Sequence, residues 1–226
     1  MPMAVHLLTP PLREGDHLSP EEFLHRWDRM PDVNRAELID GIVHMPSPVS
    51  LVHSNFQIRL GGWLICYVAA TPGCDAGADG TWLMSSNNIA QPDLALRILE
   101  EFGGQSKVEG KYPVGAPELI VEISHTSSKR DTGAKLLLYE RSGVREYLVV
   151  QPEQQLIVWR ELVDGKYREL KADAGGFLRS RVFPGLWLDV AALWKCDFAG
   201  LAAAVQLGVA TQEHQAFVLE LARKKK

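Results

Sequence analysis

The chain has 226 residues and a mass of 25.1 kDa, which is enough for one sizeable hydrophobic core and short for two full domains. With 46% hydrophobic and 23% charged residues, its composition excludes a disordered, collagen-like or coiled-coil chain. The formal net charge is −4, and it is −8 without the C-terminal Arg-Lys-Lys-Lys, because 20 basic residues then face 28 acidic ones. This balance argues against a broad basic surface for nucleic acid.

Cysteine usage and hydropathy indicate the compartment. Cys66, Cys74 and Cys196 form no C-x-x-C pair, which suits a reducing cytoplasm and argues against a structural zinc site. The N-terminal residues lack the charged segment and long apolar run of a signal peptide. The most apolar stretch, residues 60–70, has 11 residues, whereas a membrane span needs about 20. We therefore expect a cytoplasmic protein with no membrane partner.

A short helix and a hairpin are predicted near the N-terminus. Ser19 followed by proline fits an N-cap with proline at the first helical position, and predicts a helix over residues 20–29. Residues 35–45 (RAELIDGIVHM) alternate around Asp40 and Gly41, which is a strong hairpin signal.

A long helix comes next. Apolar residues recur at helical spacing over residues 50–69, and the Pro-Gly pair at 72–73 ends this pattern. Residues 81–99 read as strand, interrupted by a turn at the Asn-Asn pair 87–88. Residues 102–115 are rich in glycine and lysine and are predicted to form a loop.

The middle of the chain predicts a strand, a helix and two more strands. Residues 117–124 (PELIVEIS) form a short apolar run with polar ends, typical of a buried central strand. Residues 127–143 predict a helix that ends at Gly143, a favoured residue just after a helix. Residues 146–162 predict two strands joined by a turn at Pro152.

The C-terminal part completes the predicted architecture. Residues 166–170 add a further strand, and the Ala-rich residues 199–222 predict a helical segment. This order of elements indicates an α/β (α+β) fold, a mixed central sheet flanked by helices. We expect one domain over residues 1–198 and a helical appendage with a basic tail over residues 199–226. The sequence has no G-x-G-x-x-G or P-loop motif to indicate a nucleotide site.

Glu122 is the most informative residue for function. It stands in the apolar run Leu-Ile-Val-Glu-Ile, and burying an unpaired carboxylate costs several kcal/mol. Because side chains alternate along a strand, Glu122 and Ser124 share one face while Val121 and Ile123 point to the other. An ion pair at an exposed strand end is the less favoured alternative.

Asp93 provides a second candidate acid. It follows Pro92 where a strand is expected to begin, and an Asp after Pro is also ordinary turn chemistry. Two carboxylates at the ends of adjacent buried strands repel each other unless a divalent ion lies between them. Such oxygen ligands favour magnesium or manganese over zinc.

Lys135 is a candidate cation on the helix after Glu122. Asp131, Lys135 and Tyr139 are spaced four apart, so they share one stripe of that helix. Lys135 either forms an ordinary pair with Asp131 or reaches Glu122, where its ammonium would orient a water or stabilise developing phosphorane charge. The spacing alone does not decide between these readings.

Three other residues are weaker candidates. Glu37 lies on the first arm of the predicted hairpin, where it either joins the site or faces solvent. His53 lies in the predicted long helix, and such a histidine is more often a cap or core residue than a base. Ser124 lies outside any G-x-S-x-G motif, so it is not supported as an acyl-transfer nucleophile.

Three blocks of sequence together resemble a known family. The blocks AELIDGIVHMPSPVSLVHS, QPDLAL and PELIVEISHTSSKRDTGAKLLLYERSGVREYLVV occur in this order. They look like the signature blocks of the Uma-two-type family of restriction endonucleases, and the resemblance covers about residues 15–190. It implies a PD-(D/E)XK nuclease core that binds magnesium and cleaves phosphodiesters.

The resemblance assigns roles to individual residues. It makes Pro92-Asp93 the "PD" and Glu122 the "(D/E)" of the motif. Glu37 matches the upstream acid of the family, and His53 matches a histidine in its first long helix. The resemblance also makes a homodimer a reasonable expectation.

One departure from the superfamily pattern concerns the lysine. Ser124 stands two residues after Glu122, where the superfamily usually has lysine. Similar proteins supply the lysine from the following helix, where Lys135 lies. If Lys135 does not reach the site, the resemblance points instead to a degraded nuclease that only binds.

These considerations favour a metal-dependent DNA endonuclease. Asp93, Glu122 and Glu37 would hold one or two Mg²⁺ or Mn²⁺ ions, assisted by Ser124 or a nearby backbone carbonyl, and Lys135 would position the attacking water. The DNA partner is weakly supported by charge. It would contact basic residues on and after the helix, namely Lys129, Arg130, Arg141 and Arg145.

Two alternatives use the same fold, which does not by itself fix a function. The first is a catalytically inactive nucleic-acid-binding or assembly module, dimeric through surfaces at Trp63, Trp159 or Trp187. The second is a hydrolase of another phosphodiester or another metal-dependent enzyme.

Overall fold

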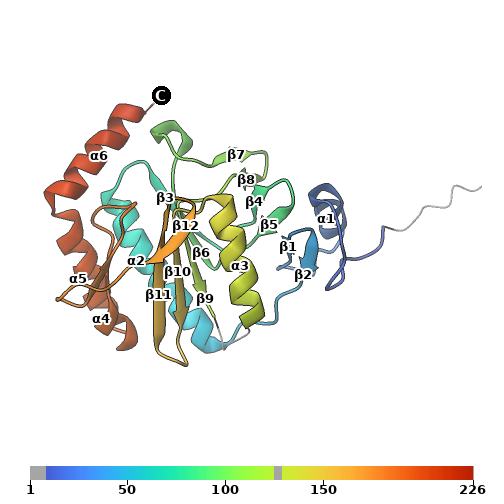
Figure 1. The fold of residues 1–226 in the computed structure, drawn as a ribbon, viewed down its shortest axis with the longest axis horizontal. Helices are drawn as coiled ribbons and strands as arrows, with labels where there is room; N and C mark the ends of the chain where they lie inside the picture. The colour runs from blue at the N-terminus through green and yellow to red at the C-terminus, as the bar shows by residue number, and fades with distance from the viewer. Residues whose placement is uncertain (1–8, 125–128, 226) are drawn as a thin grey trace, which may run out of the picture.

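A six-stranded mixed sheet with buried inner strands forms the centre of the computed structural model, which describes residues 9–124 and 129–225 (Figure 1). The strand order is β12-β11-β10-β9-β6-β3, with β9 and β10 parallel and the other neighbours antiparallel. The strands are β3 (Cys74–Ala78), β6 (Leu94–Ile98), β9 (Leu119–Ile123), β10 (Glu146–Gln151), β11 (Leu156–Val163) and β12 (Lys166–Glu169). Every residue of β9 is buried, which confirms the predicted central strand.

A second sheet lies beside the first and has the strand order β2-β1-β5-β4-β8-β7. The predicted hairpin forms its first two strands, with the turn residues Asp40 and Gly41 at positive φ of 51° and 77°. The prediction of a loop over residues 102–115 is wrong, because this segment contains the β7–β8 hairpin, which turns at Gly110. The strands are β1 (Glu37–Ile39), β2 (Ile42–His44), β4 (Trp82–Ser85), β5 (Asn88–Ala90), β7 (Lys107–Glu109) and β8 (Tyr112–Val114).

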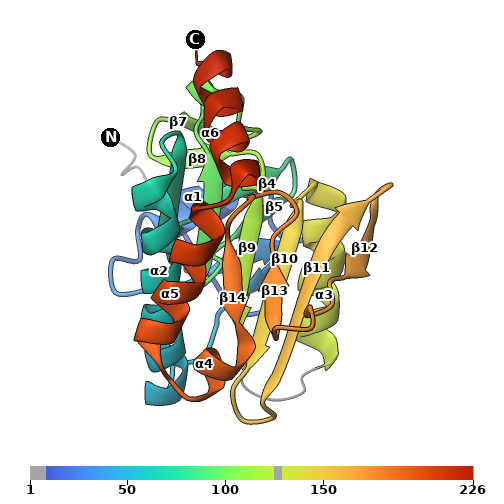
Figure 2. The same ribbon diagram turned by 90° about the vertical axis from the view of Figure 1, so that its left-hand side faces the viewer.

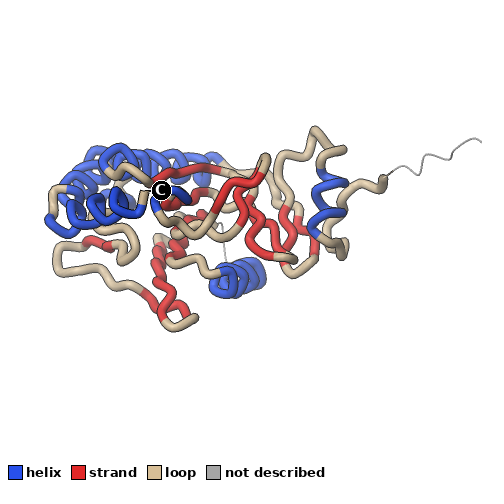
Figure 3. Tube along the Cα trace, turned by 90° about the horizontal axis from the view of Figure 1, so that it is seen from above, coloured by secondary structure: helices blue, strands red, loops and turns tan. Residues whose placement is uncertain are grey.

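Helices cover both faces of the central sheet, as the views in Figures 2 and 3 show. Along β9, Val121 packs with α2 and the C-terminal helices, whereas Ile120 packs with α3. The predicted mixed sheet flanked by helices is therefore confirmed. The helices are α1 (Pro20–Trp27), α2 (Leu51–Ala70), the 3-10 helix η1 (Glu100–Phe102), α3 (Lys129–Ser142), α4 (Val190–Trp194), α5 (Phe198–Val209) and α6 (Gln212–Lys224).

The helix ends follow local sequence signals. Ser19 and Ser50 cap α1 and α2 by accepting hydrogen bonds from backbone N–H groups in the first turn. Gly143 follows α3 with a φ of +80°, the left-handed conformation that glycine adopts without steric cost.

The C-terminal segment is built into the main core. Two helices, α5 and α6, replace the single helical segment predicted, because Thr211 caps a new helix. Leu201 and Val205 of α5 join the core cluster formed by α2 and the central sheet. A two-stranded sheet, β13 (Phe177–Arg179) with β14 (Trp187–Asp189), precedes α4 and α5 in the chain. A domain boundary at residue 198 remains a prediction.

Two of the three tryptophans that the sequence suggested as dimer surfaces, Trp63 and Trp159, do not reach the surface, whereas a dimer surface at Trp187 remains a prediction. Trp63 and Trp159 are completely buried and pack edge to face, with ring centroids 5.8 Å apart. Trp187 is partly buried and stacks under the guanidinium of Arg179. In residues 9–124 and 129–225, no helix combines the length and apolar character that crossing a membrane requires.

Candidate active site

Glu122 on β9 faces α3 and is held by two side chains of that helix. Its Oε1 lies 3.0 Å from Lys135 Nζ and accepts a hydrogen bond of 2.7 Å from the hydroxyl of Tyr139. Lys135 and Tyr139 are one helical turn apart, so both reach the same carboxylate. The structure therefore brings Lys135 to Glu122, the second of the two arrangements considered from the sequence.

Lys135 also contacts a second buried acid. Its Nζ lies 3.0 Å from Oε1 of Glu37, at the start of β1. The same oxygen accepts a 2.8 Å hydrogen bond from the backbone N–H of Gln91. The Gln91 side chain in turn accepts from the N–H of Ala36, which fixes the segment that precedes Asp93 against β1. One ammonium thus joins carboxylates from two sheets.

Asp93 lies immediately before β6, beside Glu122 on the neighbouring strand β9. Its Oδ2 accepts a 2.7 Å hydrogen bond from the backbone N–H of Ile123 and lies 3.0 Å from His53 Nε2. Its Oδ1 accepts a 3.0 Å hydrogen bond from the Arg35 guanidinium. Asp93 is thus anchored by α2, by β9 and by the segment before β1.

Burial and these charges set the pKa values of the site. Burial raises the pKa of Glu122 to about 7. The positive charge of Lys135 lowers this pKa, but repulsion from the carboxylates of Asp93 and Glu37 offsets that effect. Burial acts to lower the pKa of Lys135, but the two glutamates outweigh it and raise this pKa. For Asp93, burial is outweighed by the His53 contact, the Ile123 N–H and Arg35, so its pKa is lowered.

A cleft of about 530 Å³ opens over this cluster. Its walls come from the β1–β2 hairpin, the start of α2, the start of β6, the end of β9, and α3. It is lined by Glu37, His53, Asp93, Glu122, Ser124 and Lys135, together with Arg35 and Gln91. The predicted candidates therefore converge on one concave site, which is the usual location of a catalytic centre.

The donor set of the cleft suits a hydrated divalent ion. In the described structure, Oε1 of Glu122 accepts the hydrogen bonds from Lys135 and Tyr139. Glu122 lines the cleft, and its other oxygen, Oε2, is left to bind a metal ion. Asp93 and Ile123 line the same cleft. Mg²⁺ is typically held by one or two carboxylates and keeps several waters. Among the residues that the structure describes, no three His, Cys, Asp or Glu side chains are already arranged around a cation position.

The structure also contains site residues that the sequence analysis did not identify. Arg35 contacts both Asp93 and Asp79, and Gln57 of α2 donates to Asp79 over 3.0 Å. Alternation along the extended chain places Arg35 on the same side as Glu37, which is the signal that could have identified it. The structure describes the backbone of Asp131, the other proposed partner of Lys135, but not its side chain.

The basic residues near α3 have protein partners where they are described. Arg141 forms two hydrogen bonds of 2.9 and 2.8 Å with the carboxylate of Asp40, and Arg145 donates to Gln105. The structure describes the backbone of Lys129 and Arg130 but not their side chains. The proposed DNA contacts of these four residues remain a prediction.

Comparisons with known proteins identify the family and the fold. The sequence profile of the Uma2 family, described as "Putative restriction endonuclease", matches residues 20–191. A solved structure of a "putative nuclease belonging to DUF820" from Anabaena variabilis aligns with a TM-score of 0.59 at 14% identity, covering 76% of this chain and 97% of that chain. No curated protein matches the sequence.

The family match covers the charged residues that contact one another in the cleft, from Arg35 to Lys135. The structural alignment confirms the predicted restriction-endonuclease-like fold. Because the profile matches most of its length, the chain belongs to the Uma2 family of restriction endonuclease-like proteins.

Proposed function

We propose that the protein is a metal-dependent endonuclease that hydrolyses phosphodiester bonds in DNA. The observation that carries this proposal is the position of Lys135, 3.0 Å from both Glu37 and Glu122, with Asp93 anchored on the adjacent strand. Buried acids paired with one lysine in a cleft are costly for stability, and such arrangements are typical of functional sites.

Asp93 and Glu122 would hold a Mg²⁺ or Mn²⁺ ion, with the backbone carbonyl of Ile123 or the hydroxyl of Ser124 assisting. When bound, the ion supplies positive charge that polarises a phosphate and lowers the pKa of a water. It would also offset the local acidity, and so make the site compatible with a polyanion despite the net charge of −4.

The protein groups around these ligands would position the reactants. Lys135 Nζ would donate a hydrogen bond to the attacking water and hold it in line with the scissile phosphate. Glu37 accepts from Lys135 and so fixes the direction of the ammonium, while Tyr139 fixes Glu122. His53 and Arg35 would keep the Asp93 carboxylate oriented.

Nicking of supercoiled plasmid DNA tests this proposal. We expect cleavage that requires Mg²⁺ or Mn²⁺, stops with chelator, and falls at least about 100-fold in Glu122→Ala and in Lys135→Ala. Lys166→Ala is the matched control and should cleave like the wild type, because the exposed Lys166 of the edge strand β12 pairs with Glu140 of α3. Cleavage that survives in Lys135→Ala would contradict the assigned role.

A specific observation favours a second candidate, a nucleic-acid-binding or assembly module without catalysis. Lys135, Arg35 and His53 already contact the three acids, so each of these carboxylates has a protein partner without an ion. This candidate predicts that DNA is retained without cleavage and that chelator does not change retention. A protein that neither cleaves nor retains DNA would contradict both candidates.

A further inference from the structure

A second cavity lies between α3 and the strands β10 and β11. Gly133 and Leu136 of α3 form one wall of this α3 cavity, and side chains of the two strands form the other. Its volume is about 220 Å³, far more than the roughly 10–15 Å³ that a single water needs. The α3 cavity therefore has room for a small ligand.

The α3 cavity adjoins the catalytic cleft across β10. Tyr147 and Val149 of this strand line both spaces. Strand pairing places Val149 beside Glu122 of β9, and Tyr147 beside Arg160 of β11. Directly paired residues point to the same face of a sheet. Glu122 and Arg160 therefore lie on the face that α3 covers, with β10 as the floor between them.

The hydroxyl of Tyr147 is an unused hydrogen-bonding group between the two spaces. Tyr147 is only 2% exposed, yet its hydroxyl makes no hydrogen bond within the described structure and is not closed off from solvent. A buried tyrosine hydroxyl usually has a partner. Burial raises the pKa of this phenol, and the charges of Glu122 and Lys135 in the cleft and of Arg160 in the cavity also act on it.

Arg160 supplies a cation that no carboxylate neutralises directly. Its neighbour across the strand pair is Glu169 of β12, but the carboxylate of Glu169 binds Lys171. Within the part of the chain that the structure describes, the Arg160 guanidinium forms neither an ion pair nor a hydrogen bond. The α3 cavity therefore offers an unpaired positive charge, in contrast to the acidic catalytic cleft.

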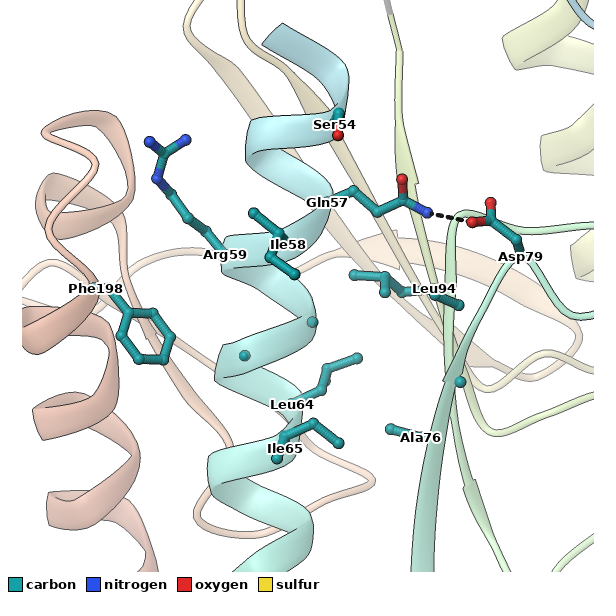
Figure 4. A pocket seen from close by; sticks show the side chains of 14 residues that line it. Ser54, Gln57, Ile58, Arg59, Leu64, Ile65, Ala76, Asp79, Leu94 and Phe198 are labelled. Atoms are coloured by element: carbon teal, nitrogen blue, oxygen red, sulfur yellow. Dashed lines mark hydrogen bonds between the residues drawn. The ribbon is translucent and has the colours of Figure 1, made fainter. Parts of the chain in front are cut away.

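The larger groove between α2 and β3, of about 670 Å³, has no comparable groups (Figure 4). None of its described polar lining residues is buried, and most of the lining is apolar. Gln57 donates to the carboxylate of Asp79, and Arg59 donates to the backbone carbonyl of Asn55. Buried, unpaired polar groups thus distinguish the smaller α3 cavity as a ligand site.

We propose that the α3 cavity binds one unpaired nucleotide, with its phosphate held by Arg160 and Tyr147. The guanidinium and the hydroxyl both donate hydrogen bonds, and a guanidinium matches the geometry of a phosphate. Leu136 from α3 and Val158 from β11 provide apolar contacts for the faces of a base. The amide of Gln151, also in the lining, can pair with the edge of a base.

The size of the cavity specifies the substrate class. A space of about 220 Å³ admits a single nucleotide and excludes a duplex, so the nucleotide would come from a single strand or be turned out of the base stack. Its neighbour in the same strand would then lie over β10, in the catalytic cleft. This role in cleavage rests on the proposed nuclease function, whereas nucleotide binding itself does not.

Calorimetric titration of the metal-free protein with thymidine 5′-monophosphate tests the proposal. Without metal the acidic cleft repels phosphate, so binding reports on the α3 cavity. We expect a dissociation constant below about 1 mM, raised at least about tenfold in Arg160→Gln and at least about threefold in Tyr147→Phe. Thymidine, which lacks the phosphate, should bind at least about tenfold more weakly than the monophosphate.

Arg168→Gln is the matched control. Arg168 pairs with Asp164 and is mostly exposed. It precedes Glu169, the cross-strand neighbour of Arg160, and therefore points to the opposite face of the sheet. This variant should bind the monophosphate like the wild type.

A wild type that does not bind the monophosphate, or an Arg160→Gln variant that binds it as tightly as the control, would overturn the proposal. Tyr147→Phe keeps the ring that packs edge to face on Tyr139, so folding should persist, and circular dichroism checks this for each variant.

Cleavage of a single-stranded oligonucleotide with Mg²⁺ separates this inference from the proposed function. In Arg160→Gln we expect KM to rise at least about fivefold while kcat stays within about twofold of the wild type, because Arg160 would bind the strand away from the reacting atoms. A wild type that binds the monophosphate as described but cleaves no DNA would contradict the nuclease and support the nucleotide site. Cleavage with an unchanged KM in Arg160→Gln would contradict the nucleotide site alone.

Discussion

Lys135 compensates two buried carboxylates at once. Its Nζ is 3.0 Å from oxygens of Glu37 and Glu122, and both glutamates are almost inaccessible to solvent. Removing one member of a buried ion pair leaves an uncompensated charge, which costs more than the pair itself contributes. The proposed catalytic lysine is therefore also a structural residue, and its two contributions need separate measurements.

Lys135→Met keeps the apolar stem and removes the ammonium. We expect the free energy of unfolding at neutral pH to fall by about 3 kcal/mol, because Glu37 and Glu122 then repel each other without compensation. Urea denaturation measures this value. The double variant Glu122→Gln, Lys135→Met should lose less than the sum of the two single variants, because it removes one of the unpaired charges. Strict additivity would show that the two side chains do not interact.

Residue spacing anticipated part of this site. The apolar run around Glu122 indicated a buried acid, and the four-residue interval to Tyr139 placed Lys135 and that tyrosine on one stripe. Arg35 was not anticipated, because its two partners, Asp79 and Asp93, lie 44 and 58 residues further along the chain. Alternation places Arg35 on the same side as Glu37, but it does not show which distant acids the guanidinium meets, because tertiary packing sets those contacts.

At the scale of elements, α5 is held by an unusually close backbone approach. A Cβ added at Gly208 of α5 would lie 2.1 Å from the carbonyl oxygen of Gly185, in the turn between β13 and β14. This glycine lets the helix pack directly on the turn. The contact joins the C-terminal helices to the rest of the core.

Gly208→Ala should therefore push α5 away from the turn and lower the free energy of unfolding by about 2 kcal/mol or more. Gly133→Ala is the matched helical control, because a Cβ at Gly133 of α3 would have no atom within 4 Å. We expect this control to stabilise the protein by up to about 1 kcal/mol through helix propensity. Equal denaturation midpoints for the two variants would contradict the packing argument.

Elements with strong local signals were predicted, and those without them were not. The Asp40-Gly41 hairpin and α2 have turn chemistry or long helical periodicity. β3 has the sequence Cys-Asp-Ala-Gly-Ala, which lacks the β-branched and aromatic residues that favour strands. It forms because it pairs with β6. The β7–β8 hairpin was missed for a related reason, since each arm has three residues and shows little alternation.

At the scale of the whole molecule, several buried glutamates carry raised pKa values. Burial raises the pKa of Glu146 to about 7, although Oε2 accepts from Ser180 Oγ and Oε1 accepts from the N–H groups of Arg181 and Val182. Burial likewise raises the pKa of Glu118 and of Glu122. The net charge of −4 therefore does not describe the interior, where acids hold protons that they would lose on unfolding.

The protein should accordingly be more stable at pH 5 than at pH 7.5. Between about 4.3, the ordinary pKa of glutamate, and about 7, folded Glu146 keeps a proton that the unfolded chain has released. The free energy of unfolding therefore falls as pH rises through this window, by on the order of 3 kcal/mol for Glu146, and then levels off. The lowered pKa of Asp93 acts in the opposite direction below about pH 4.

Urea denaturation across this pH range measures the profile, and Glu146→Gln isolates one residue. Glutamine keeps Oε1 as an acceptor for Arg181 and Val182 and donates to Ser180 Oγ instead of accepting from it. It cannot ionise, so the fall in stability between pH 5 and 7.5 should be clearly smaller in this variant. Glu213→Gln, at an exposed position on α6, should keep the wild-type profile. A wild-type stability that rises steadily from pH 5 to 7.5 would mean that Glu146 is ionised in its buried position, with the three donors sufficient to hold its charge.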